Sequence, residues 1–152
     1  MKRNNTLKDL LKMEQNIVND LLKLFNDKHD FDRIIYTEWT AKDVFAHIVM
    51  WHESFANNII DLINGNELNL LKGLLYEINE KGVREYKKYT IEELKIKIIN
   101  AQEKINGNIE NGKIKSMPYR KNSKREYTKE EHLEIVYKHI KGHYKDIIKN
   151  IK

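Results

Sequence analysis

The sequence predicts an all-α protein, a four-helix bundle with a long, partly helical crossover between its second and third helices. Four threonines each stand three residues before an acidic residue and directly before apolar residues at helical spacing. This Thr-x-x-Asp/Glu pattern is typical of the capping box at a helix start. No stretch shows the sustained alternation of apolar and polar residues that a strand requires. The four pairs are Thr6 with Asp9, Thr40 with Asp43, Thr90 with Glu93, and Thr128 with Glu131.

Apolar residues at a spacing of 3.6 predict the extent of each long helix. The four helices are expected over about residues 7–26, 41–64, 91–109 and 129–150. Glu14 interrupts the apolar stripe of the first helix, a position that in a bundle commonly reaches solvent at the rim. Residues 67–88 are also helical in pattern, but Gly73 and Gly82 break them. This segment therefore predicts the partly helical crossover.

Size and composition restrict the class of protein. The chain has 152 residues, of which 40% are hydrophobic, so we expect a single domain over residues 1–152. Cysteine is absent, which excludes disulfides, thiolate ligands and a cysteine nucleophile. No apolar run approaches the roughly 18 residues of a membrane span. The basic N-terminal stretch passes directly into an amphipathic pattern without the apolar segment of a signal peptide. These features predict a cytoplasmic protein outside membranes.

The formal net charge of +5 raises the question of nucleic acid, since basic surfaces attract phosphate. Only five of the 28 basic residues are arginine, and the lysines are interspersed with Asp and Glu. That pattern is typical of solvated helix faces. The one long linker, residues 111–127, carries six basic residues against Glu126. We expect a solvated loop there, with a phosphate-binding patch over residues 113–125 as the alternative.

Histidines concentrate on the last predicted helix. His132, His139 and His143 fall within about 40° of one another on a helical wheel, beside the apolar stripe. His139 and His143 are one turn apart, the spacing at which two imidazoles on a helix can reach one ion at about 2.0–2.1 Å. His132 is two turns from His139 and flanks the pair. The pattern predicts a metal-binding face, and half-buried packing histidines are the alternative interpretation.

The second predicted helix carries His47 and His52 at opposite edges of its buried stripe. One of them could face the last helix, and spacing alone leaves open which one does. A third imidazole would complete three protein ligands and leave a position for water, whose pKa a zinc-like ion lowers to about 7. Zinc, nickel and iron all accept histidine ligands. The sequence thus predicts a divalent metal without fixing its identity.

Residues 38–55, EWTAKDVFAHIVMWHESF, resemble the second helix of the DinB-like superfamily of four-helix bundles and, within it, of the ClbS/DfsB family. The shared features are a tryptophan before a threonine cap, then Lys-Asp, Ala-His and Trp-His. His143 and Tyr144 resemble the His-Tyr pair of the family's last helix. Asn79 and Glu80 fall in register with its Leu-Asn-Glu stretch. The resemblance covers most of the chain.

The resemblance implies a small-molecule enzyme or a protective protein. DinB-like relatives often hold a divalent ion on one histidine of the second helix and two of the last, which correspond to His47, His139 and His143. The superfamily includes thiol-dependent transferases and metal-dependent hydrolases. The ClbS branch includes a self-resistance protein that hydrolytically opens the electrophilic ring of a genotoxin, with no metal assigned. Relatives often pair, so the resemblance also raises a homodimer as a hypothesis.

The roles of further residues follow from the resemblance as hypotheses. Three residues are candidates for the general base: Glu14, Glu80 and Tyr144. On the ClbS branch, an apolar pocket would orient a water without metal and would be lined by Trp51, His52, Asn79 and Tyr144. The chain departs from the ClbS pattern in two places. His139-Ile140 replaces the branch's usual Asn-Thr, which favours the three-histidine arrangement. The branch's Pro- and Trp-containing loop is missing. The alternative function is a non-catalytic binder that sequesters a toxic compound, or a protector of DNA through residues 113–125.

Gly142 stands between the two histidines of the last helix. A glycine in a helix interior costs about 1 kcal/mol relative to alanine, so a packing or functional reason is expected. On the helical wheel Gly142 lies about 60° from His139. The missing side chain predicts room beside the pair for a ligand or for a closely packed neighbouring helix.

Overall fold

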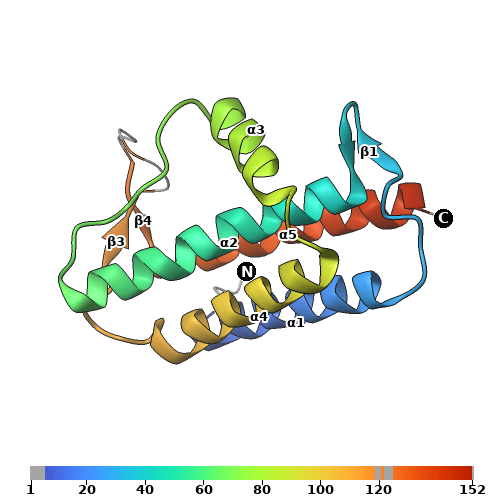
Figure 1. Ribbon diagram of the computed structural model, residues 1–152. Coiled ribbons are helices and arrows are strands. Elements are labelled where there is room, and N and C mark those ends of the chain that lie inside the picture. The colour runs from blue at the N-terminus through green and yellow to red at the C-terminus, as the bar shows by residue number, and fades with distance from the viewer. Residues whose placement is uncertain (1–5, 119–120, 122–124, 152) are drawn as a thin grey trace.

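A computed structural model of the chain describes residues 6–118, 121 and 125–151. Its architecture is the predicted all-α bundle of four long helices, with a shorter helix in the crossover (Figure 1). The helices are α1 (Leu7–Asn26), α2 (Ala41–Asn64), α3 (Leu75–Tyr86), α4 (Ile91–Asn108) and α5 (Lys129–Ile151). The boundaries of the four long helices agree with the predicted ones to within one residue at each end.

The direction of the helices explains the crossover. In Figure 1, α1 and α5 run one way and α2 and α4 run the other way. α2 packs against α4 and α5, and α1 packs against the same two helices. Because α2 and α4 are parallel, the chain between them must return along the length of the bundle. The returning segment carries α3, which packs on α2.

All four predicted capping boxes are present, at Thr6, Thr40, Thr90 and Thr128. In each box the threonine hydroxyl accepts a hydrogen bond from the backbone N–H three residues later. The acidic side chain at that later residue accepts one from the threonine N–H. A cap of this kind contributes about 1 kcal/mol, which is why the helix starts could be predicted from the sequence.

Two short antiparallel strand pairs, which the sequence did not predict, flank the bundle. β1 (Ile34–Tyr36) pairs with β2 (Trp39–Thr40) before α2, and β3 (Ser116–Met117) pairs with β4 (Tyr127–Thr128) before α5. Each strand has only two or three residues, which is too short for an alternating pattern to be recognised. The first pair matters for function because it carries two aromatic side chains to the end of the bundle where His47 lies.

The core divides into two apolar clusters along the bundle, each built from all four long helices. Glu14, His52 and Gln102 occupy the interior where one cluster gives way to the other, and each is at most 2% exposed. We call these three residues the Glu14–His52–Gln102 layer. The expectation that Glu14 reaches solvent is wrong, because the side chain points into the bundle between Leu10 and Ile17.

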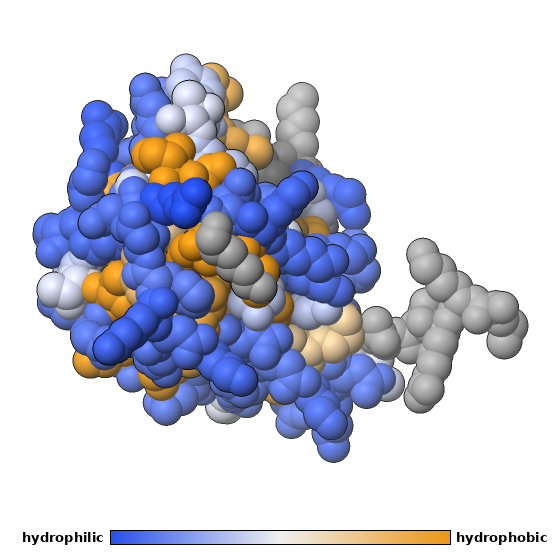
Figure 2. Space-filling view, turned by 90° about the vertical axis from the view of Figure 1, so that its right-hand side faces the viewer, coloured by the Kyte–Doolittle hydropathy of each residue, from blue (hydrophilic) through white to orange (hydrophobic). Residues whose placement is uncertain are grey.

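The face of the molecule that Figure 2 shows is mainly hydrophilic, with hydrophobic residues between the hydrophilic ones. Within the described ranges, no helix combines the length and the apolar character needed to cross a membrane. The basic segment 113–125 lies only partly inside those ranges. In its described part, Arg125 pairs with Glu131 at 3.0 Å and lies over the ring of Tyr127.

Candidate metal centre and adjoining cavity

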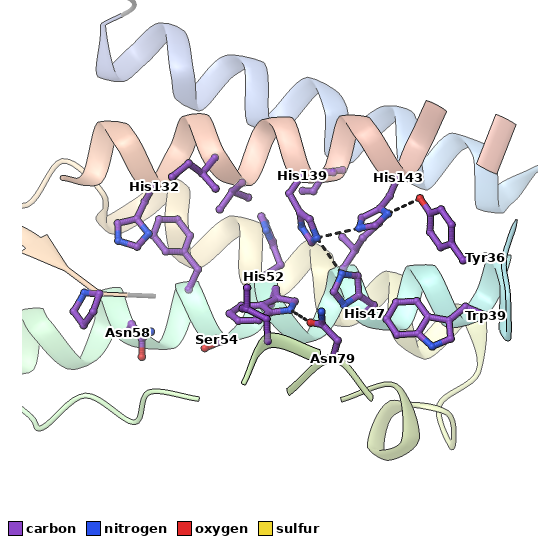
Figure 3. A pocket seen from close by; sticks show the side chains of 18 residues that line it. Tyr36, Trp39, His47, His52, Ser54, Asn58, Asn79, His132, His139 and His143 are labelled. Carbon is purple, nitrogen blue, oxygen red and sulfur yellow. Dashed lines mark hydrogen bonds between the residues drawn. The ribbon is translucent and has the colours of Figure 1, made fainter. Parts of the chain in front are cut away.

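Three histidines from two helices direct their Nε2 atoms toward one another (Figure 3). The Nε2 atom of His139 lies 3.0 Å from Nε2 of His47 on α2 and 3.0 Å from Nε2 of His143 one turn along α5. Two nitrogens that each bind one ion at about 2.1 Å are about 3.0–3.4 Å apart in octahedral or tetrahedral geometry. These two separations therefore suit a shared metal ion. Of the two histidines left open on α2, it is His47 that faces the last helix.

The environment keeps these imidazoles in the neutral form that binds metals. Burial, together with the neighbouring His139 and His143, lowers the pKa of His47 to about 2. Burial, together with the neighbouring His143 and His52, lowers the pKa of His139 to about 4. Burial also lowers the pKa of His143, although the Asp146 carboxylate opposes the change. At pH 7 a metal ion would therefore not compete with protons for these ligands.

His143 is oriented by a hydrogen-bonded partner that the sequence analysis missed. The Tyr36 hydroxyl lies 2.5 Å from Oδ2 of Asp146 and 2.9 Å from Nδ1 of His143. Because the hydroxyl donates to the carboxylate, its oxygen accepts from the Nδ1–H of His143. The lone pair of His143 is then on Nε2, directed at the cluster, as in histidines whose ring orientation an outer partner fixes for a metal. His47 has no such support: its Nδ1 is buried without a hydrogen-bond partner in the described part.

The three converging nitrogens cannot all satisfy one another. With the proton of His143 on Nδ1, its Nε2 can only accept, so His139 would have to supply the proton for that contact. The same single N–H of His139 would also have to serve the contact with His47. One cation, in contrast, satisfies all three lone pairs at once. The donor set and its geometry therefore fit a divalent metal.

A cavity of about 520 Å³ adjoins the cluster, between α2 and α5. It is lined along α2 from His47 to Asn58 and along α5 from His132 to His143 (Figure 3). Each of these stretches covers eleven steps of helical rise, about 16 Å, so the cavity is elongated, with the three histidines at one end. Its volume is typical of a small-molecule site.

Three residues that the resemblance placed in a pocket do line this cavity: Trp51, His52 and Asn79. The Trp51 Nε1–H donates to Oδ1 of Asn79 at 2.8 Å and so connects α2 to α3. Gly82 permits the close packing of the two helices, because a Cβ atom there would stand 2.6 Å from Cε of Met50.

Behind the cavity, the Glu14–His52–Gln102 layer forms a second buried polar group. His52 donates through Nε2–H to Oε1 of Gln102 at 2.7 Å, and Gln102 donates onward to Asn106. Burial raises the pKa of Glu14 to about 8, opposed in part by the Gln102 amide, and burial lowers the pKa of His52 to about 4. At pH 7 both are neutral, so their 3.9 Å approach is not an ion pair. Within the described residues, neither carboxyl oxygen of Glu14 has a hydrogen-bond partner.

The other candidate residues lie elsewhere. Glu80 is exposed on α3 and does not line the cavity. Tyr144 lines a separate, smaller cavity with residues of α1, where burial and nearby Asp20 raise its pKa. His132 lines the far end of the main cavity, with Nε2 2.8 Å from the carbonyl oxygen of Met117. It flanks the cluster, as expected.

Gly142 is exposed and lies outside the cavity lining. No side chain or neighbouring helix comes within 4 Å of the position of a Cβ atom there. The expectation of a closely packed helix beside the histidine pair is therefore wrong, and the glycine adds no space to the cavity.

No family model, curated protein or solved structure matches this chain. The geometry alone therefore defines the class of protein. It is an all-α helical bundle with a candidate three-histidine metal centre at one end of an elongated cavity.

Proposed function

We propose that this chain is a DinB-like protein of the ClbS type that detoxifies or protects against an electrophilic small molecule. In this proposal a divalent zinc, nickel or iron ion is held by His47, His139 and His143, and the chain acts as a hydrolase or transferase in the cavity between α2 and α5. The observation that carries the proposal is the convergence of three Nε2 atoms on one point of the cavity wall. The sequence resemblance supports the same three ligands.

The chain's own residues would bind and orient the substrate. A divalent ion, when bound, supplies a water with a pKa near 7. The Tyr36 hydroxyl holds the His143 ring, and the mainly apolar lining excludes bulk water. None of the general-base candidates Glu14, Glu80 and Tyr144 lines the cavity, so a role for Glu14 would have to act through His52.

Sequestration without catalysis is the second candidate function. It is favoured by one observation, that no carboxylate lines the described part of the cavity to act as a base. The two functions separate on turnover. A catalyst converts many equivalents of a neutral epoxide into the diol, whereas a binder retains about one equivalent of unchanged epoxide per chain.

Metal analysis tests the proposal. Protein without an affinity tag should be stripped with a chelator, incubated separately with zinc, nickel and iron(II), and freed of excess metal. We expect about one equivalent of at least one metal in the parent chain and none in His139→Ala. His29→Ala removes a histidine of the loop after α1, outside the cluster, and should bind metal like the parent. Absence of stoichiometric binding for every metal would refute the metal centre.

The alternative of DNA protection has its own test. Binding through residues 113–125 predicts an affinity that falls steeply with salt. It should also depend on Lys121, Lys124 and Arg125, of which Lys124 lies outside the described residues. Absent or salt-independent DNA binding would exclude this alternative.

A further inference from the structure

Among the described residues, those that line the main cavity carry no formal charge. None of the 18 described residues that line it is Asp, Glu, Lys or Arg, although these make up 34% of the chain. The ionisable groups in the wall are Tyr36, His47, His52, His132, His139 and His143. The described wall therefore offers the body of a ligand no residue that carries a fixed charge.

The middle of the wall is apolar. Phe55 on α2 and Val136 and Ile140 on α5 line this part of the cavity. Ile135 also lines it and is 36% exposed. Moving an unpaired ion into such surroundings costs several kcal/mol. Burying hydrocarbon there contributes about 25 cal/mol per Å². The wall thus selects against charge along the body of a ligand and favours apolar surface.

The length of the cavity limits the length of the ligand. The distance of about 16 Å along α2 and α5 corresponds to an extended chain of roughly 14 bonds, taking 3.3–3.6 Å for every three bonds. The three histidines lie at one end of this span and His132 at the other. A molecule that fills the cavity therefore places one end at the histidine cluster.

We propose that the substrate of this cavity is an uncharged, elongated and mainly apolar molecule with one polar reactive group at the His47–His139–His143 end. This inference rests on the proposed function, since it takes the cavity as the substrate site.

The two tryptophans of the chain provide a direct measurement, because both Trp39 and Trp51 line the cavity. Metal-free protein, kept in chelator, is titrated with 1-hexanol, 1-octanol and 1-decanol while tryptophan emission is followed. The alkanoates and alkylammonium ions of the same lengths are titrated in parallel. We expect saturable binding of the alcohols, tightening about three- to fourfold per methylene, and at least tenfold weaker binding of both ions.

Three results would overturn the proposal: no saturable binding of any alcohol, no dependence on chain length, or octanoate or octylammonium binding as tightly as octanol. Because no metal is present, a failed metal centre leaves this measurement unaffected. Failure of the substrate class and failure of the metal centre are therefore distinguishable.

A charge introduced at the edge of the cavity tests whether the alcohol and carboxylate probes bind inside it. Ile135→Lys should shift the ratio of octanoate to octanol affinity toward octanoate by roughly three- to tenfold, as expected for a partly exposed charge pair. The matched control Ile96→Lys places the same charge on α4 outside the cavity lining, at a residue that is 58% exposed. It should leave the ratio unchanged. Equal shifts in both variants, or no shift in Ile135→Lys, would show that the probe binds elsewhere and would overturn the proposal.

Discussion

Two groups of polar side chains lie inside this bundle, and they are built in opposite ways. In the His47–His139–His143 cluster, three imidazole nitrogens point at one another. In the Glu14–His52–Gln102 layer, His52 donates to Gln102, Gln102 donates to Asn106, and Asn106 donates to Gln15 at the surface of α1. The cluster lacks a partner that would complete it, whereas His52 and Gln102 of the layer form hydrogen bonds with side chains of the protein, although the Glu14 carboxyl oxygens have no partner among the described residues.

The difference teaches which buried histidines are candidates for ligand binding. Burial and a lowered pKa do not distinguish a ligand-binding histidine from a structural one, because burial lowers the pKa of both His52 and His139. The direction of the hydrogen bonds distinguishes the two kinds. His52 uses its N–H on an amide oxygen from a neighbouring helix, whereas His139 shares one nitrogen between two other imidazoles. We therefore expect His139 to serve metal binding and His52 to serve the stability of the bundle.

Exchanging the two histidines for alanine gives the largest expected effects and tests this assignment directly. His139→Ala should abolish stoichiometric metal binding but change the stability of the metal-free protein by less than about 1 kcal/mol, since it relieves a crowded set of acceptors. His52→Ala should keep metal binding but destabilise by about 2–4 kcal/mol, because it leaves Gln102 unpaired in the core and opens a cavity. Urea unfolding and metal titration of both variants measure the contrast. The same pattern in both would contradict the assignment.

Tyr36→Phe tests the support of the cluster. The substitution removes the hydroxyl that accepts from Nδ1–H of His143 and donates to Asp146. Loss of an outer partner of this kind weakens metal binding by about 10- to 100-fold, and we expect a loss in that range in a competition titration with a chromophoric chelator. Tyr127→Phe, in β4 and outside the cavity lining, is the control and should bind metal like the parent. An unchanged affinity of Tyr36→Phe would show that His143 needs no such partner.

Glu14→Gln tests the layer through the dependence of stability on pH. The Glu14 carboxyl titrates near pH 8 when folded, against 4.5 as its ordinary value. Between these values the folded protein holds a proton that the unfolded chain has released, so the unfolding free energy falls as pH rises. The five histidines whose pKa values burial lowers from 6.5 act in the opposite direction until the unfolded chain has released its imidazolium protons, at about pH 7.5. The parent and Glu14→Gln carry the same histidines, so the difference between their profiles isolates Glu14.

Between pH 6.5 and 8 the unfolding free energy of the parent should fall by about 2 kcal/mol relative to that of Glu14→Gln. Glu14→Gln keeps the histidine contribution alone, so its stability should rise over this interval. Glu80→Gln, which changes an exposed carboxyl on α3, should follow the parent. Urea unfolding of the chelator-treated proteins at pH 6.5, 7.25 and 8 provides the measurement. Profiles of the same shape in the parent and Glu14→Gln would mean that the Glu14 carboxyl ionises inside the bundle or meets water there.

These contrasts also show which features of the structure could be predicted from the sequence. Helix limits were predictable because the Thr40–Asp43 box and its counterparts are local signals three residues long. Residues one turn apart, such as His139 and His143, were predictable for the same reason. The role of Tyr36 was not, because its contact with His143 joins residues 107 apart and no local pattern encodes it. Glu14 was misplaced because an acidic residue in an apolar stripe is ordinarily at a rim, and here the bundle encloses it.

Gly142→Ala has the smallest expected effect and separates local helix propensity from the site. Nothing lies within 4 Å of the new Cβ atom, so the variant should gain up to about 1 kcal/mol of stability and bind metal like the parent. Gly82→Ala is the comparison, since it also lies inside a helix but its Cβ atom would meet Met50 at 2.6 Å. The displacement of Met50 or α3 should offset the gain there. If Gly142→Ala instead weakened metal binding, the space beside His139 and His143 would belong to the site, and the boundary drawn between cluster and helix surface would have to move outward.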